Sequence, residues 1–280
     1  MAALDLRSLA EFSEARAFSS LIGGAPERVK RQYGFSAAVL GGATALVAPS
    51  VTNSLNLNRV IGLDIEEPAT DAILDQIAEL YGRHNLSYAI EVAPGALPSE
   101  LPEQLRKRRL RRTVSTAMHY RAAQPVVEGT TEISVVRAEA KHGTLVADIC
   151  CSVFRMPAAA HAAIEATREA AEWRHWLVYL GQQPIAAALS FVKGGVAWLG
   201  WDATLPEFRG HRAQAALIAR RVNDAVDRGC RFVTAETAVD TPARIDPSRR
   251  NYEKLGFVLA YERSTYVAIH GSRFRTLTPG

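Results

Sequence analysis

Apolar positions recur every three to four residues in some stretches of the chain and alternate with polar positions in others, so helices and short strands are interspersed. Helices are predicted near residues 4–22, 70–83, 98–109, 143–153, 157–172, 213–228 and 248–255. Strands are predicted near residues 37–48, 58–63, 87–92, 112–120, 133–137, 175–180, 185–192, 196–203, 231–236 and 257–268, the first as one strand or a bent pair and the last as a pair. Thr70 is a typical N-cap, and Gly229 is a typical residue after a helix end.

The order strand, helix, strand, short helix, strand occurs twice, from residue 58 to 120 and from residue 196 to 268. This repetition indicates a duplicated fold, and 280 residues are enough for two domains. The stretch between Ala122 and Thr131 has little periodicity and is interpreted as a linker. We therefore expect an α/β (α+β) protein of two lobes, residues 1–124 and 132–280, each a mixed, mostly antiparallel sheet flanked by helices.

Composition narrows the function classes. The chain is 48% hydrophobic and 22% charged, which suits packed cores, and no uncharged apolar run reaches the ~18 residues of a membrane span. The charged residues near the start are unlike a signal peptide, so we expect a cytoplasmic protein that does not enter a membrane. A net charge of +4 suits a small polyanionic ligand but is too weak to indicate nucleic-acid binding. The basic run over residues 106–112 is expected to be a solvated helix end.

The three cysteines point to no special chemistry. Cys150 and Cys151 are adjacent and Cys230 is distant, so neither a disulfide framework nor a zinc-ligand spacing is present. We expect reduced, buried thiols and no metal.

The stretch of residues 205–214, LPEFRGHRAQ, lies between a predicted strand and a predicted helix. The first amides of a helix have no intrahelical partner, and the helix dipole is positive at this end, so phosphates bind there readily. Arg209, His211 and Arg212 would add cationic donors. The loop is thus either an anion site or an ordinary basic loop.

A second block one strand later favours the anion site. Tyr252, Lys254, Gly256 and Phe257 follow the pattern Y-x-K-x-G-F, and the loop matches P-x-[YF]-R-G through Pro206, Phe208, Arg209 and Gly210. Together the two blocks resemble the GNAT superfamily of acyl-CoA-dependent N-acetyltransferases over about residues 133–268. The two-lobed layout is more distantly similar to the bacterial tandem members of that superfamily.

Three positions depart from the family pattern. Arg212 and Gln214 stand where the family usually has glycines, which let a pyrophosphate approach the backbone. Ile245 stands where the family has an asparagine, and Asn251 is a candidate substitute.

The resemblance implies direct attack of a neutral amine on the thioester of acetyl-CoA, an activity of class EC 2.3.1.-. Tyr252 occupies the general-acid position, and Glu236 and Asp202, at two strand ends, are the candidate bases. Donor contacts are expected from the loop and helix start and from the preceding strand backbone; the residues are Ala203, Thr204, Leu205, Arg209, Gly210, His211, Arg212, Ala213, Gln214 and Asn251.

The first lobe does not keep these features. It has three carboxylates over residues 64–68 where the donor loop should be, and Leu105 stands at the tyrosine position. We interpret it as non-catalytic. Structural roles are expected for Asn56, Asn58 and Arg59, and the alternative is that they face an acceptor cleft between the lobes. The expected partner is a small amine acceptor, and the expected assembly is a monomer or homodimer. A non-catalytic acyl-CoA-binding regulator and an enzyme that acetylates protein lysines or N-termini are the alternatives.

Overall fold

The computed structural model describes residues 5–52, 54–129, 132–241 and 246–270. The elements of the first half are α1 (Leu6–Gly23), α2 (Glu27–Tyr33), β1 (Ser36–Leu40), β2 (Ala43–Val47), β3 (Arg59–Ile61), α3 (Asp71–Gly82), β4 (Tyr88–Val92), α4 (Leu101–Lys107) and β5 (Arg111–Ala122). The elements of the second half are β6 (Ile133–Arg137), η1 (Ala140–His142), α5 (Leu145–Phe154), α6 (Ala158–Ala166), β7 (Trp173–Leu180), β8 (Gln183–Lys193), β9 (Val196–Thr204), η2 (Pro206–Phe208), α7 (Ala213–Asp227), β10 (Phe232–Ala238), α8 (Pro247–Lys254) and β11 (Val258–Ala268).

Most of these elements lie where the hydrophobic pattern predicts them. The Thr70 hydroxyl accepts a hydrogen bond from the Ile73 amide, as expected of an N-cap, and Gly229 has a φ of 70° after the end of α7. The expected linker has neither helix nor strand over residues 123–129. The predicted division into lobes at residues 124 and 132 remains a prediction.

The strands of the described residues form one sheet in the order β1-β2-β3-β4-β11-β5-β10-β9-β8-β7-β6. Among the described strands, only the pairs β3–β4 and β9–β10 are parallel. The expected α/β fold with a mixed, mostly antiparallel sheet flanked by helices is confirmed.

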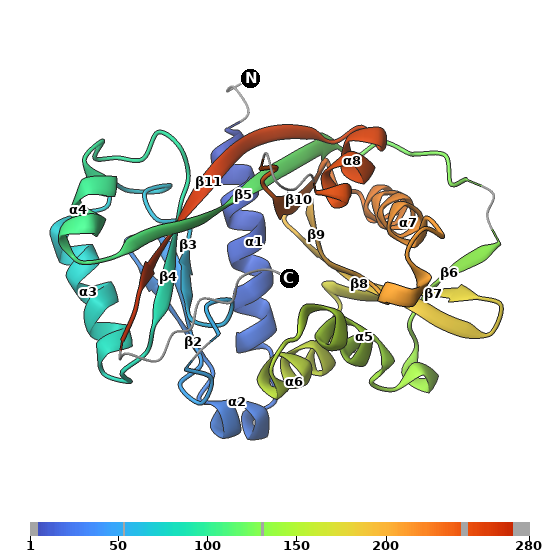
Figure 1. Cartoon of the computed structure of the whole chain (residues 1–280), viewed down its shortest axis with the longest axis horizontal. Helices are drawn as coiled ribbons and strands as arrows, with labels where there is room; N and C mark the ends of the chain where they lie inside the picture. Colours follow the sequence, from blue (N-terminus) through green and yellow to red (C-terminus); the bar gives the residue numbers. More distant parts are fainter. Residues whose placement is uncertain (1–4, 53, 130–131, 242–245, 271–280) are drawn as a thin grey trace.

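The two halves exchange their last strands across the middle of the sheet (Figure 1). β5, which ends the first half, pairs with β10 of the second half, and β11, which ends the second half, pairs with β4 of the first. β5 and β11 also pair with each other. The prediction of a strand pair within residues 257–268 is wrong: β11 is one long strand, because it has partners along both edges.

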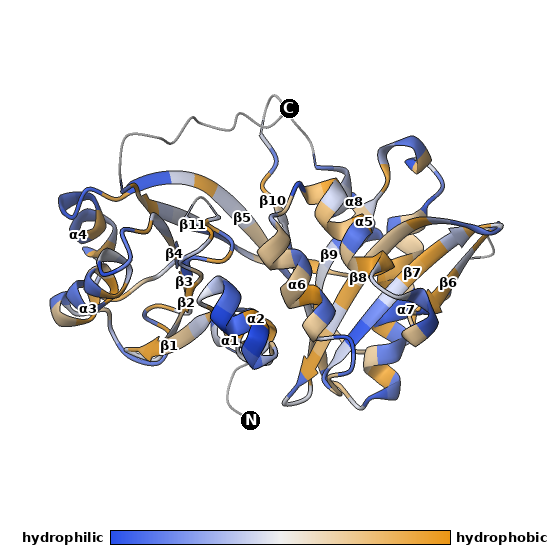
Figure 2. Ribbon diagram, turned by 90° about the horizontal axis from the view of Figure 1, so that it is seen from below, coloured by the Kyte–Doolittle hydropathy of each residue, from blue (hydrophilic) through white to orange (hydrophobic). Residues whose placement is uncertain are grey.

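Helices cover the sheet in three groups. α1 stands at the centre of the molecule and packs, with α5 and α6, against β7, β8 and β9 (Figure 1). α3 and α4 cover the strands of the first half, and α7 and α8 cover β9 and β10. The strands β7 and β8 are rich in apolar residues along their length, as expected for strands covered on both faces (Figure 2).

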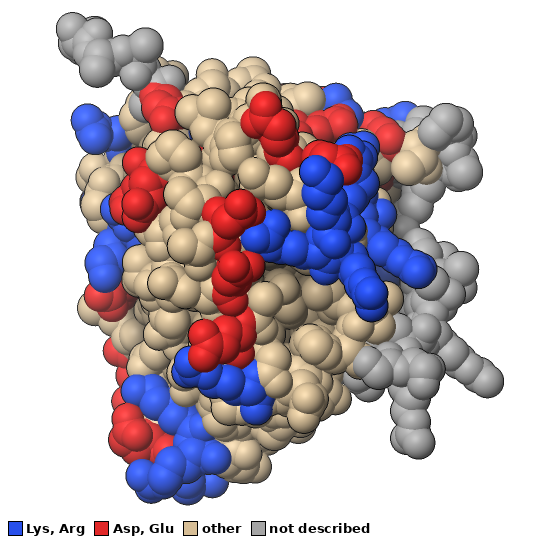
Figure 3. Space-filling model, turned by 90° about the vertical axis from the view of Figure 1, so that its left-hand side faces the viewer, with Lys and Arg blue, Asp and Glu red and all other residues tan. Residues whose placement is uncertain are grey.

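Two details of the prediction change. α6 ends at Ala166 rather than near residue 172, and α4 ends at Lys107, so the basic run continues into β5. Arg106 and Arg108 form ion pairs with acidic side chains at the surface. On the face in Figure 3, lysines and arginines gather in groups, and aspartates and glutamates lie between and beside these groups.

Candidate active site

A cavity of about 940 Å³ opens where β9 and β10 separate. The two strands pair from Val196–Phe232 only as far as Leu199–Ala235. Beyond that point β9 stays paired with β8 up to Thr204, while β10 stays paired with β5 up to Ala238. The strand ends therefore form the two walls of the cavity, which is in the usual size range of ligand sites.

The loop between β9 and α7 closes one side of this cavity. Within the described residues, no hydrogen bond is found for the five successive amides of residues 210–214. These amides lie at the start of a helix of 15 residues, where the dipole adds a positive potential. The arrangement suits a phosphate or pyrophosphate group.

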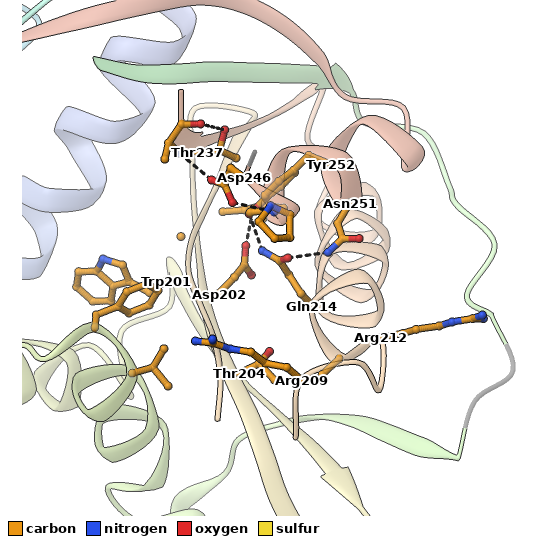
Figure 4. A pocket seen from close by; sticks show the side chains of 18 of the residues that line it. Trp201, Asp202, Thr204, Arg209, Arg212, Gln214, Thr237, Asp246, Asn251 and Tyr252 are labelled. Carbon is orange, nitrogen blue, oxygen red and sulfur yellow. Dashed lines mark hydrogen bonds between the residues drawn. The ribbon is translucent and has the colours of Figure 1, made fainter. Parts of the chain in front are cut away.

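The side chains of this loop point in different directions (Figure 4). Arg209 extends into the cavity, whereas Arg212 extends away from it. Arg212 has a φ of 60°, the left-handed conformation that glycine adopts without strain. A glycine would therefore suit this backbone position, and arginine keeps the amide by turning its side chain outward.

Gln214 does not point away from the cavity. Its amide nitrogen donates to the Ser248 hydroxyl at 2.7 Å, and its oxygen accepts from the Asn251 side chain at 2.8 Å. The start of α7 is thereby linked to α8 across the cavity wall (Figure 4).

Tyr252 lies on α8 and is 1% exposed. Its hydroxyl donates to a carboxylate oxygen of Asp202 at 2.5 Å, and the other Asp202 oxygen accepts from Arg221. Burial, and next the charge of Asp202, raises the pKa of Tyr252 well above its usual value. The phenol is therefore protonated at neutral pH.

Arg221 holds the Asp202 carboxylate in place. The side chain is fully buried on α7 and also donates to the carbonyls of Leu217 and Leu189. Asp202 thus has hydrogen-bond partners on both oxygens. The ring of His119, on β5, stacks on the ring of Tyr252 with 6.1 Å between the ring centroids.

Glu236 lies on the opposite wall, at the end of β10. One of its oxygens accepts from Arg263 at 2.9 Å, and its side chain is 26% exposed. Burial raises the pKa of Glu236 to about 7, and the negative charge of Glu14 adds to the rise, against the charge of Arg263.

The structure brings together ten of the thirteen residues singled out from the sequence: Asp202, Thr204, Arg209, Gly210, Arg212, Ala213, Gln214, Glu236, Asn251 and Tyr252. Three lie outside the cavity lining. Ala203 is buried in β9, the Leu205 amide and carbonyl already bond Ile185 and Phe208, and His211 is hydrogen-bonded to Glu132. Ile245, the departure from the family pattern, lies outside the described residues.

Several residues of the site were not predicted. Trp201, Phe154 and Thr237 line the cavity, and Asp246 caps the start of α8 through the Ser248 amide. A sequence signal existed for Asp246, since an aspartate directly before Pro247 is a typical N-cap. His175 is buried and hydrogen-bonded to Thr167.

Comparison with known proteins identifies the fold. The family model described as an acetyltransferase (GNAT) domain matches residues 152–235, which include β9, the loop between β9 and α7, and most of β10. Over these residues the chain is similar to GNAT acetyltransferases. No match is found among curated proteins.

Solved structures extend the similarity over both halves. A GCN5-related N-acetyltransferase from Kribbella flavida has a TM-score of 0.65 at 16% identity, covering 92% of this chain and 96% of that one. One from Sphaerobacter thermophilus has a TM-score of 0.60 at 12% identity, covering 95% and 96%. A tandem GNAT protein from the clavulanic acid biosynthesis pathway has a TM-score of 0.59 at 15% identity, covering 98% of both chains. At these identities the likeness is one of fold.

No helix in the described residues is both long and apolar enough to cross a membrane. They also contain no group of three or more His, Cys, Asp or Glu side chains arranged to hold a metal ion.

Proposed function

We propose that the protein is an N-acetyltransferase that moves an acetyl group from acetyl-CoA to the primary amine of a small acceptor by direct attack. The observation that carries the proposal is the cavity between β9 and β10, which combines free helix-start amides, a protonated tyrosine and a carboxylate with a pKa near 7. The GNAT domain match is independent support for acetyl transfer. The second lobe, residues 132–280, is assigned to the donor.

In this proposal the amides of residues 210–214 and the Arg209 guanidinium bind the pyrophosphate of the donor. The pantetheine arm lies between the separated strands. Backbone groups alternate along a strand, and the Leu205 amide bonds β8, so the Thr204 amide faces the opening. We infer that Thr204, and not Leu205, offers its backbone to the arm in the manner of an added strand.

The proposed base is Glu236. A carboxylate with a pKa of about 7 can accept a proton from the incoming ammonium at neutral pH and is close to the optimum for a general base. Asp202 suits this role less, because both of its oxygens already accept hydrogen bonds. We assign Asp202 to orienting Tyr252.

Chemistry then proceeds in one displacement. The neutral amine nitrogen forms a bond to the acetyl carbon, the carbon–sulfur bond breaks, and the electron pair stays on sulfur. Glu236 holds the first proton lost by the nitrogen. The Tyr252 hydroxyl has one proton, which it donates to Asp202 in this structure, and in the reaction it turns this proton toward the developing thiolate. The pKa of a thiol is about 8.5, below that of Tyr252, so the phenol stabilises the thiolate without having to ionise fully. The second proton of the nitrogen neutralises the sulfur.

Calorimetric titration of acetyl-CoA into the protein tests the donor site. Arg209→Glu should weaken binding at least about tenfold, because a charge-assisted contact is replaced by repulsion. Arg220→Glu is a matched control: Arg220 is 44% exposed on α7, pairs with Glu128 and does not line the cavity. Equal affinities of the wild type and Arg209→Glu would reject this donor site. A panel of small primary amines, followed by thiol release, then tests acetyl transfer itself.

A further inference from the structure

A buried charge cluster joins Glu236 to the first half of the molecule. It consists of four carboxylates and two guanidiniums: Glu11 and Glu14 on α1, Arg59 on β3, Glu91 on β4, Glu236 on β10 and Arg263 on β11. Five of the six residues are at most 5% exposed. With all groups ionised the cluster carries two more negative charges than positive ones, which is costly in a buried site.

Arg263 is the centre of this cluster, and most of its donors are used by the first half. One terminal nitrogen lies 2.5 Å from a Glu14 oxygen and 3.3 Å from both Glu11 oxygens. The Nε atom donates to the Thr116 hydroxyl at 3.0 Å and lies 3.5 Å from Glu91. Only the other terminal nitrogen donates a hydrogen bond to Glu236, at 2.9 Å.

Two carboxyl groups of the cluster, those of Glu11 and Glu236, bind protons more readily than the others. Burial raises the pKa of Glu11 and of Glu236, whereas the charges of Arg263 and Arg59 outweigh burial and lower the pKa of Glu14. Glu11 is 1% exposed and accepts a hydrogen bond from the Tyr261 hydroxyl, so its carboxyl group is shielded from solvent. Of the four carboxylates, only Glu236 lines the cavity.

We propose that Glu14 is a positioning residue for the reaction. Glu14 binds the guanidinium of Arg263 from the side of the first lobe, so that Arg263 pairs only weakly with Glu236. Because of this weak pairing, Glu236 can act as a proton acceptor. The proposal rests on Glu236 being the base of the proposed function. It gives the first lobe, which lacks a donor loop, a direct part in the chemistry.

The other charged groups near Glu236 do not offer an alternative counter-ion. On β5, His119 pairs in register with Ala235, next to Glu236, and its buried ring is hydrogen-bonded to Thr237. Burial, and then the charge of Arg249, lowers the pKa of His119, so this ring is neutral at neutral pH. On β9, Asp202 is bound to Arg221 and Tyr252. The cations of the cluster that act on Glu236 are Arg263 and Arg59.

The test is Glu14→Gln, which keeps the shape of the side chain and removes its charge. The acid limb of the kcat/KM–pH profile should move down by about 1 pH unit, because Arg263 is released toward Glu236 and a like charge is lost. Glu262→Gln is the matched control: it removes the same charge from an exposed position of β11, next to Arg263, and should leave the profile in place.

A second readout separates this proposal from the proposed function. The titration of Glu236 is followed by infrared difference spectroscopy, with Glu236→Gln as the reference, in both the wild type and Glu14→Gln. A downward shift of both the titration and the acid limb supports the two proposals together. A shift of the titration with an unmoved acid limb supports the role of Glu14 and rejects Glu236 as the base.

An unmoved titration in a folded Glu14→Gln variant overturns the role of Glu14. If this variant does not fold, Glu91→Gln takes its place. Glu91 contacts both Arg263 and Arg59, so removing its charge should shift the titration of Glu236 in the same direction by a smaller amount. No shift in that variant would overturn the proposal equally.

Discussion

Replacing Arg221 with methionine should destabilise the protein strongly, although an apolar side chain usually suits a buried position better than a charged one. The Arg221 side chain is fully buried and binds Asp202 as well as backbone carbonyls. Its loss leaves the Asp202 carboxylate, 9% exposed, without a counter-charge. Breaking a buried pair from one side costs about 3–5 kcal/mol, so we expect the free energy of unfolding to fall by that amount.

The neighbouring residue provides the control. Arg220 is on the same helix, but it is 44% exposed and pairs with Glu128 at the surface. Exposed ion pairs contribute about 0–1 kcal/mol, so Arg220→Met should be nearly neutral. Both variants are compared by urea denaturation at equal protein concentration, and equal m-values are required before the midpoints are interpreted.

A third variant tests the cause. Adding Asp202→Asn to Arg221→Met removes the unpaired carboxylate and should restore at least about 1 kcal/mol, since residues in contact couple by amounts of this order. If Arg221→Met costs no more than Arg220→Met, the pair is not an energetic unit. If the double variant is less stable than Arg221→Met, the stranded charge is not the cause of the loss.

Two further predictions concern the tyrosine and a buried histidine. Tyr252→Phe should lower kcat by about 10²–10⁴ with an unchanged Kd for acetyl-CoA, measured by steady-state kinetics and calorimetry; an equal loss in Kd would mean that the ring binds the donor and does not assist departure of the thiolate. His175 is buried, and burial lowers the pKa of its ring to about 4, so the unfolded state binds an extra proton between that value and about 6.5. The stability that neutral His175 contributes is therefore present above pH 6.5 and falls as the pH drops toward 4, and urea titrations should show a smaller loss between pH 7 and pH 4.5 in His175→Gln than in the wild type.

Local signals predicted most of the elements and most of the cavity. The β9–loop–α7 unit carries its information in a few adjacent residues: a glycine at Gly210, a basic residue beside it and an apolar face that begins at Ala213. A helix start with free amides follows from that short stretch alone. Tyr252 was found through the resemblance to the GNAT family, and Glu236 through its place near the end of a predicted strand.

Long-range pairings escaped prediction. Glu11 and Glu14 look like solvent-facing charges of a helix start, yet they bind Arg263, about 250 residues later in the chain. Arg221 has a clearer signal, because it is four residues after Leu217 and thus on the buried face of α7. A charge on an apolar face must have a partner, but spacing along a helix does not reveal which carboxylate it meets.

The exchange of β5 and β11 explains why the charge cluster exists where it does. A strand that alternates in polarity can pair with any neighbour of matching pattern, and the chain resolves this choice by crossing each last strand to the other half. Arg263 is thereby carried on a strand of the second half into the first, where α1, β3 and β4 supply acids and a second arginine. β10, which bears Glu236, is in turn paired with a strand of the first half. The same crossing that builds the continuous sheet thus places charged residues of the first half beside the wall of the candidate active site.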